Sequence, residues 1–133
     1  MNYTTLEQSK KLVELGINPN TADMHIISYS NDRGGYFYTS LCYSKWDAEH
    51  TEGYFPCWSL GALLKIIPTK IGKHLDYWLT METTTACNYV LFYKNIYSNE
   101  EICISSKNKN PLDSAVDLIK KLTKEGFLNT KGE

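Results

Sequence analysis

The sequence has no long hydrophobic run and no paired-cysteine motif, and both absences narrow what the protein can be. No stretch approaches the roughly 18 apolar residues of a membrane-spanning helix, and the N-terminus lacks the basic and apolar regions of a signal peptide. We therefore expect a cytoplasmic protein. Cys42, Cys57, Cys87 and Cys103 are too widely spaced for a CxxC pair or a zinc ribbon. We expect four reduced thiols, although the even count leaves a disulfide open.

A strong charge of either sign is also missing. The chain carries 14 basic and 15 acidic side chains, and its net charge is −1. Such a chain has no global field to attract nucleic acid or an anionic membrane, so either partner would require a local basic patch. We expect neither nucleic acid nor a membrane as a partner.

The common cofactor and nucleophile signatures, GxGxxG, GxxxxGK, GxSxG and HExxH, do not occur. The densest set of potential metal ligands is Asp47, Glu49, His50 and Glu52 in "KWDAEHTE", but their spacing matches no usual metal-binding helix or loop. Side chains of this kind in a loop are usually solvated charges. We expect no cofactor and no bound metal.

What the chain does have is an ordinary globular composition with many aromatics. It has 133 residues, of which 42% are apolar, and these include ten Tyr, three Trp and four Phe. A chain of this length buries roughly two thirds of its unfolded surface around one core. We expect one domain over residues 1–133, with a frayed tail at 129–133.

Apolar periodicity and capping residues predict three helices. The first covers residues 5–15, with Thr4 and Glu7 as a capping box and Gly16 as its stop. A short second helix, 60–67, has Ser59 as its cap. The third begins after Asn110 with Pro111 in its first turn and ends at Gly126.

Between these helices, alternating β-branched and aromatic residues predict strands. Segments 25–30 and 36–44 flank the turn cluster "SNDRGG" and read as a β-hairpin, and 45–56 reads as a loop that ends in a proline. Segments 75–83, 87–95 and 101–107 form a predicted three-stranded meander. The order α-β-β-α-β-β-β-α predicts an α+β fold with a mostly antiparallel sheet, a hairpin plus a meander, and N-terminal, central and C-terminal helices.

Cys57 is the one candidate for a reactive thiol. It lies just before the predicted helix 60–67, where free N–H groups and the helix dipole can lower a thiol pKa. Catalysis would also need a base close by, and no spacing places His25, His50 or His74 there. The favoured alternative is that Cys57 and Trp58 pack over the start of this helix.

The aromatic residues indicate a candidate interaction surface. In the meander, Trp78, Val90 and Phe92 lie on the face opposite Leu75 and Leu79, so both faces are apolar. Core packing explains this directly, whereas exposure would mark an interface. The candidate surface residues are Trp58, Trp78, Phe92, Tyr36 and Tyr38. A second copy could also cover this face, which makes a homodimer possible.

From residue 60 to residue 128, the order helix, three strands, helix also matches the outline of the double-stranded RNA-binding domain. That fold needs a basic start to its last helix, because it binds phosphates there. Here Asp113 and Asp117 occupy the first turns. This alternative therefore depends on element order alone.

Three stretches, "EQSKKLVELGINPNTADM", "PCWSLGALLKIIP" and "NPLDSAVDLIKKLTKEGFL", resemble a group of uncharacterised small proteins of gut Bacteroidales genomes, their prophages and related mobile elements. The resemblance implies a phage or mobile-element accessory protein. It carries over no site residues. We expect a non-enzymatic protein-interaction module, with a thiol-dependent enzyme centred on Cys57 and an RNA-binding module as alternatives.

Overall fold

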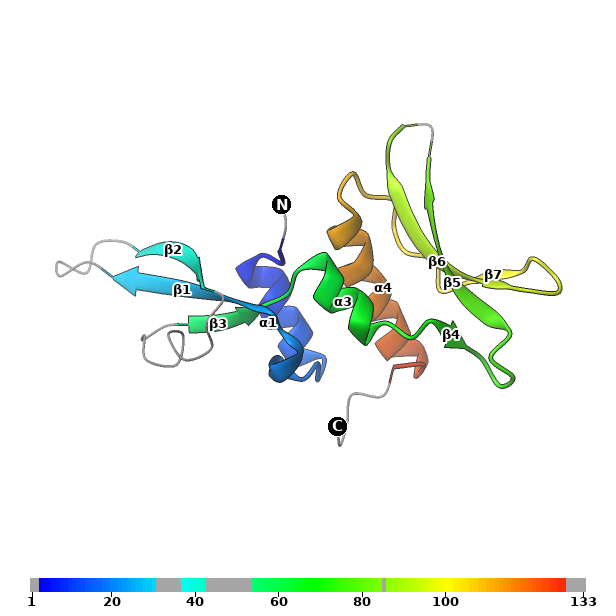
Figure 1. Ribbon diagram of the computed structural model, residues 1–133, viewed down its shortest axis with the longest axis horizontal. Helices are drawn as coiled ribbons and strands as arrows, with labels where there is room; N and C mark the ends of the chain where they lie inside the picture. The colour runs from blue at the N-terminus through cyan, green and yellow to red at the C-terminus, as the bar shows by residue number, and fades with distance from the viewer. Residues whose placement is uncertain (1–2, 31–36, 43–53, 85, 129–133) are drawn as a thin grey trace.

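The computed structural model describes residues 3–30, 37–42, 54–84 and 86–128. For residues 27–30 and 37–42 it describes the backbone alone, and for the other ranges it describes the side chains as well. The three α-helices of the described ranges lie in the middle of an elongated molecule, with one antiparallel sheet on either side (Figure 1). The predicted α+β class and element order are confirmed, but the hairpin and the meander belong to two separate sheets. The elements are α1 (Leu6–Glu14), η1 (Pro19–Thr21), β1 (Met24–Ser30), β2 (Phe37–Cys42), β3 (Tyr54–Cys57), α3 (Leu60–Ile66), β4 (Lys70–Ile71), β5 (Tyr77–Thr83), β6 (Tyr89–Asn95), β7 (Glu101–Ile102) and α4 (Pro111–Glu125).

Helix α1 begins one residue later than predicted. Thr5, not Thr4, is the N-cap: its side chain accepts a hydrogen bond from the backbone N–H of Gln8, and the Gln8 side chain accepts one from the backbone N–H of Thr5. Two adjacent threonines made the cap ambiguous, and Thr4 is instead fully buried. Gly16 follows the helix with φ of 96°, as a left-handed stop requires.

The first sheet has the strand order β2-β1-β3. The predicted hairpin is confirmed, since β1 and β2 pair antiparallel from His25 opposite Cys42 to Ser30 opposite Phe37. The prediction that 45–56 is all loop is wrong at its end, because β3 pairs with β1 there. Pro56 is tolerated because β3 is an edge strand, where a missing N–H breaks no ladder.

The second sheet has the order β4-β5-β6-β7 and contains the predicted meander. Strand β4, which pairs with Tyr77 and Trp78 of β5, was not predicted. Strand β7 ends at Ile102, well short of the predicted 107, and Cys103 has a φ of 52° that interrupts a strand. Beyond that break, the N–H of Ser105 still donates to the carbonyl of Leu91 in β6.

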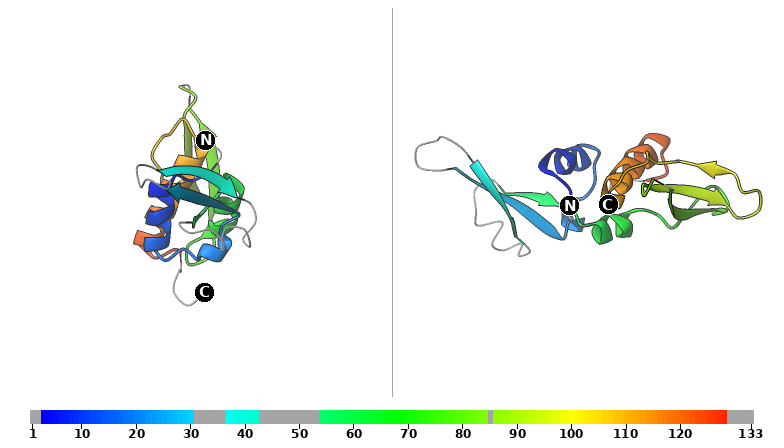
Figure 2. Two further views of the ribbon diagram at one scale, coloured as in Figure 1. Left: turned by 90° about the vertical axis from the view of Figure 1, so that its left-hand side faces the viewer. Right: turned by 90° about the horizontal axis from the view of Figure 1, so that it is seen from above.

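Helices α3 and α4 pack together, and the right-hand view in Figure 2 shows them between the two sheets. The side chain of Ser59 caps α3 as predicted. The start and end of α4 are also confirmed: Asn110 accepts from the N–H of Leu112, Pro111 lies in the first turn, and Gly126 is left-handed. Both helices therefore have the boundaries that their capping residues require.

The main core lies between the helices and the second sheet. It gathers Leu63 from α3, Leu118 and Ile119 from α4, and Leu91 and Tyr93 from β6. A smaller cluster of Met24, Ile26 and Cys57 belongs to the first sheet. No helix in the described ranges is long and apolar enough to cross a membrane. The predicted frayed tail, 129–133, lies outside the described residues, and the single domain stays a prediction.

Candidate functional site

Cys57 is fully buried, and its chemistry is that of a packed thiol. Burial, with a smaller contribution from the negative charge of Asp23, raises the pKa of Cys57 from 9.0 to about 12. This shift is opposite to the lowering that a helix N-terminus would give, because desolvation outweighs the dipole of the short helix α3. A thiol with this pKa stays protonated at neutral pH. The burial of Cys57 agrees with the favoured interpretation, that Cys57 packs at the start of this helix, and argues against the candidate reactive thiol.

The sheet also separates Cys57 from the nearest described imidazole. Cys57 pairs with Met24, whereas His25 pairs with Pro56. Neighbouring residues of a strand point to opposite faces, so the thiol and the imidazole of His25 lie on different sides of the sheet. His74 is exposed, and His50 lies outside the described residues. The geometry offers no Cys–His pair in the described chain.

Two of the five candidate surface aromatics are part of the interior. Trp58 is fully buried in the main core, where its indole N–H donates to the Thr21 hydroxyl at 2.9 Å. Phe92 is nearly fully buried as well. Their place in an exposed surface is therefore a wrong prediction, because the chain itself covers both rings. Tyr36 lies outside the described residues, and so does the side chain of Tyr38.

Trp78 is the candidate that remains exposed, and it lies between two lysines. Strand pairing places Lys70, Trp78 and Lys94 side by side on one face of the second sheet. The Lys70 ammonium is 4.7 Å from the centre of the Trp78 ring, a cation–π contact. Neither lysine forms a salt bridge within the described part of the chain, although Glu101 of β7 pairs with Lys94 on the side away from Trp78. The charge beside Trp78 that has no acidic cross-strand neighbour is that of Lys70.

Three further apolar residues are exposed near Trp78, in the turns at the outer end of this sheet. The β4–β5 and β6–β7 turns both lie at the end of the molecule farthest from the first sheet (Figure 1). Together with Trp78 they form what we call the tip surface, and the exposed fractions of its members are Leu75 57%, Trp78 45%, Ile96 44% and Tyr97 80%.

Hydrogen bonds hold the two turns of the tip surface together. The N–H of Ile96 donates to the carbonyl of Asp76 at 2.9 Å, and the Tyr77 hydroxyl donates to Glu100 at 2.8 Å. The Trp78 indole N–H donates to the carbonyl of Leu75 at 3.2 Å, which fixes the ring. These bonds connect the backbones of the two turns to each other and the Trp78 ring to the first of them.

The sequence reasoning missed most of the tip surface. Leu75 was expected to face the core from a strand, but it lies in a turn with φ of 56°. Ile96 and Tyr97 lie in the β6–β7 turn, where large apolar side chains are uncommon. The apolar pair Ile96 and Tyr97 within the turn sequence "NIYSN" could have indicated an exposed apolar surface from the sequence alone. The positions of Lys70 and Lys94 beside Trp78 depended on strand register, which the sequence does not specify by itself.

Potential metal ligands do not converge in the described residues, where no three His, Cys, Asp or Glu side chains form a group that could hold an ion. The cluster from Asp47 to Glu52 lies outside the described residues. Cys57, Cys87 and Cys103 are free thiols, and the side chain of Cys42 is not among those described.

The chain was also compared with known proteins. No family model, no curated protein and no solved structure matches it.

Proposed function

We propose that the protein is a non-enzymatic interaction module that binds a partner protein with the tip surface. The observation that carries this proposal is the gathering of four exposed, large apolar side chains at one end of one sheet. Aromatic residues in such patches supply most of the binding energy of protein interfaces. An accessory protein of phage or mobile-element origin, acting in a cytoplasm, would fit this role.

Charge indicates what the partner presents. Lys70 and Lys94 flank the Trp78 ring without salt bridges in the described chain. A partner segment with an apolar side chain for Trp78 and a carboxylate on either side would complement both features. The partner is thus a protein segment of mixed apolar and acidic character.

The alternatives have less support. An enzyme centred on Cys57 would need an accessible thiolate, and that thiol is buried with a raised pKa. An RNA-binding module would need cations at the start of α4, where Asp113 accepts a hydrogen bond from Gln8 and Asp117 accepts one from the backbone of Ser106. The acidic first turns of α4 thus have structural partners.

Selection from a displayed random peptide library on the immobilised protein tests the proposal. We expect enriched peptides to carry an aromatic or aliphatic residue beside Asp or Glu. Synthetic copies of these peptides should bind the Trp78→Ala variant roughly tenfold or more weakly than the wild type, as expected for a central anchor. The Lys94→Glu variant should also bind them more weakly, because it reverses the complementary charge.

Phe127→Ala is the matched control, because Phe127 is an exposed aromatic at the end of α4 and not part of the tip surface. This variant should bind the peptides like the wild type. Equal loss in both variants, enrichment without acidic residues, or tighter binding of single-stranded oligonucleotides than of peptides would each overturn the proposal.

A further inference from the structure

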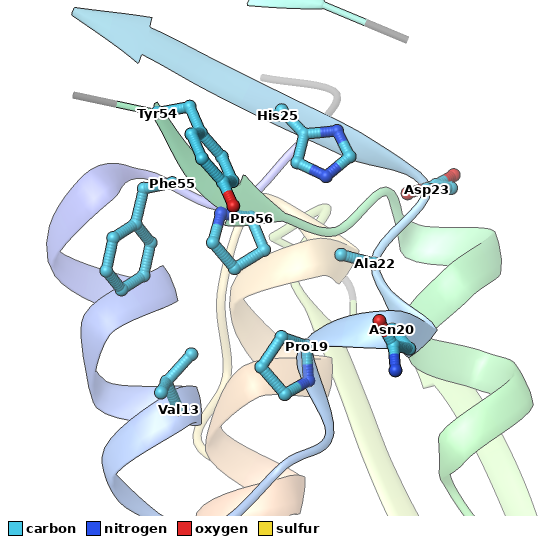
Figure 3. Close-up of a pocket in the computed structure, with 9 residues that line it drawn as sticks. All are labelled: Val13, Pro19, Asn20, Ala22, Asp23, His25, Tyr54, Phe55 and Pro56. Atoms are coloured by element: carbon cyan, nitrogen blue, oxygen red, sulfur yellow. The ribbon is translucent and has the colours of Figure 1, made fainter. Parts of the chain in front are cut away.

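A cavity of about 490 Å³ lies beside the first sheet, on the other side of the helices from the tip surface. Its walls come from α1, η1, β1 and β3. The side chains around it are mostly apolar (Figure 3), and the principal ones are Val13, Pro19, Ala22, Phe55 and Pro56. A cavity of this size and character is in the range of small-molecule binding sites.

His25 brings a polar group into this apolar cavity. Its imidazole extends from β1 into the space between Pro56 and Ala22, with one ring nitrogen directed toward the cavity (Figure 3). The side chain is only 8% exposed, and its Nδ1 has no hydrogen-bond partner in the described part of the chain. Tyr54 contacts the imidazole edge-on, with ring centres 6.0 Å apart, and so helps to fix its orientation.

The other polar side chains of the cavity either form hydrogen bonds within the chain or lie at the rim. Asp23 accepts hydrogen bonds from the backbone N–H of Ser59, at 2.9 Å, and from the Ser59 hydroxyl, so it is bound to the start of α3. Asn20 lies exposed at the rim. His25 is therefore the buried polar side chain that a ligand in this cavity would meet.

The burial of Nδ1 indicates which kind of hydrogen bond His25 offers. A buried N–H without a partner is rarer in proteins than a buried lone pair without one. In its neutral form, the imidazole then carries its proton on Nε2 and leaves the lone pair on Nδ1. The nitrogen that faces the cavity is accordingly a hydrogen-bond donor, and it requires an acceptor oxygen.

We propose that this cavity is a binding site for a neutral aromatic small molecule that carries an acceptor oxygen, such as an aryl ketone. The aromatic part would pack between the proline, valine and phenylalanine side chains, and the oxygen would accept from Nε2 of His25. The Asp23 carboxylate lies on the same cavity and repels an anion, so the ligand is not a carboxylate or another anion. This site is independent of the tip surface.

Two probes of the same shape test the site. 2-Acetylnaphthalene has the acceptor oxygen, and 2-isopropenylnaphthalene replaces its C=O by C=CH₂. We expect the ketone to bind one per chain, roughly three- to tenfold more tightly than the hydrocarbon, as one hydrogen bond in a buried site allows. 2-Naphthoate should bind more weakly than the ketone. Calorimetry and the fluorescence of the naphthalene ring give the affinities.

Variants then assign the site. His25→Phe should lose the preference for the ketone while it still binds the hydrocarbon, and Ala22→Phe should lose both by filling the cavity. The wild type alone provides a second readout, because the ketone should shift the ¹⁵N resonances of the His25 imidazole and the hydrocarbon should shift them less. Equal affinity for both probes, no binding of the ketone, or an unchanged preference in His25→Phe would overturn the proposal.

Discussion

Thr4 and Trp58 are joined by two hydrogen bonds. The N–H of Thr4 donates to the carbonyl of Trp58 at 2.8 Å, and the N–H of Trp58 donates to the Thr4 hydroxyl oxygen at 3.0 Å. Both residues are fully buried, so these bonds are shielded from water. They connect the segment before α1 to the segment before α3, and thereby position the cysteine, the tryptophan and the helix that follow.

The first prediction concerns this junction. Thr4→Val keeps the shape of the side chain but leaves the N–H of Trp58 without its acceptor and removes the 2.8 Å contact with the Ser9 hydroxyl. The free energy of unfolding should fall by about 1–3 kcal/mol. Chemical denaturation measures it. Thr69→Val, at an exposed site, is the control and should change stability by less than about 0.5 kcal/mol; equal effects would contradict the junction's role.

A second prediction follows from the pKa of Cys57. Between pH 9 and pH 12 the thiol ionises in the unfolded chain while it stays protonated in the fold, because burial raises its pKa to about 12. The Cys57 contribution to stability is therefore complete below pH 9 and is lost as the pH rises through this window. The wild type should lose stability relative to Cys57→Ala over that range. A constant difference between the two denaturation curves would contradict the raised pKa.

The third prediction compares two thiols. Cys87 is exposed in the turn between β5 and β6, whereas Cys57 is buried. At pH 7.5, iodoacetamide should modify Cys87 readily and modify Cys57 only after the protein is unfolded in denaturant. Mass spectrometry of proteolytic fragments gives the rate at each site. Modification of Cys57 as fast as that of Cys87 in the native protein would mean that the thiol is accessible.

The sequence predicted the helices and the hairpin well because their signals are local. Asn110, Pro111 and Gly126 are capping residues whose effect depends on immediate neighbours, and each occupies its expected position in α4. At α1 the same reasoning missed by one residue, because either Thr4 or Thr5 can cap. The choice depended on Trp58, which is distant in sequence and binds Thr4.

Features that depend on long-range pairing were not predictable in this way. Strand β3 exists because β1 offers it an edge, and Pro56 argued against it locally. Phe92 lies on the face of β6 opposite the core residues Leu91 and Tyr93, where alternation predicts an exposed side chain, yet Phe92 is buried. The exposure of Trp78, between Lys70 and Lys94, likewise depended on which strands pair and in what register.

The fourth prediction concerns nucleic acid. The first turns of α4 present carboxylates, and the net charge of the chain is −1. Few phosphate contacts can form, so binding to duplex RNA should be weak and lost at about 0.15 M salt. Fluorescence anisotropy with a labelled duplex measures it. Submicromolar affinity at that salt would contradict the prediction and would support the RNA-binding alternative.

The last prediction is association into a homodimer. Its original basis, two apolar sheet faces, is weaker because Val90 and Phe92 are buried in their own chain. A different basis remains, because β4 pairs with β5 only at Tyr77 and Trp78, and the Leu79 N–H donates to the carbonyl of Thr69. Within the described chain, the β5 edge beyond Leu79 lacks a partner strand. Antiparallel pairing of the β5 edges of two copies would give the unpaired backbone groups of both edges hydrogen-bond partners. Sedimentation at micromolar concentration should give a dimer. Met81→Lys should dissociate this dimer, because it places a charge on the edge strand. Leu6→Lys, at an exposed site on α1, is the control and should leave the dimer intact. A wild-type monomer would exclude this pairing.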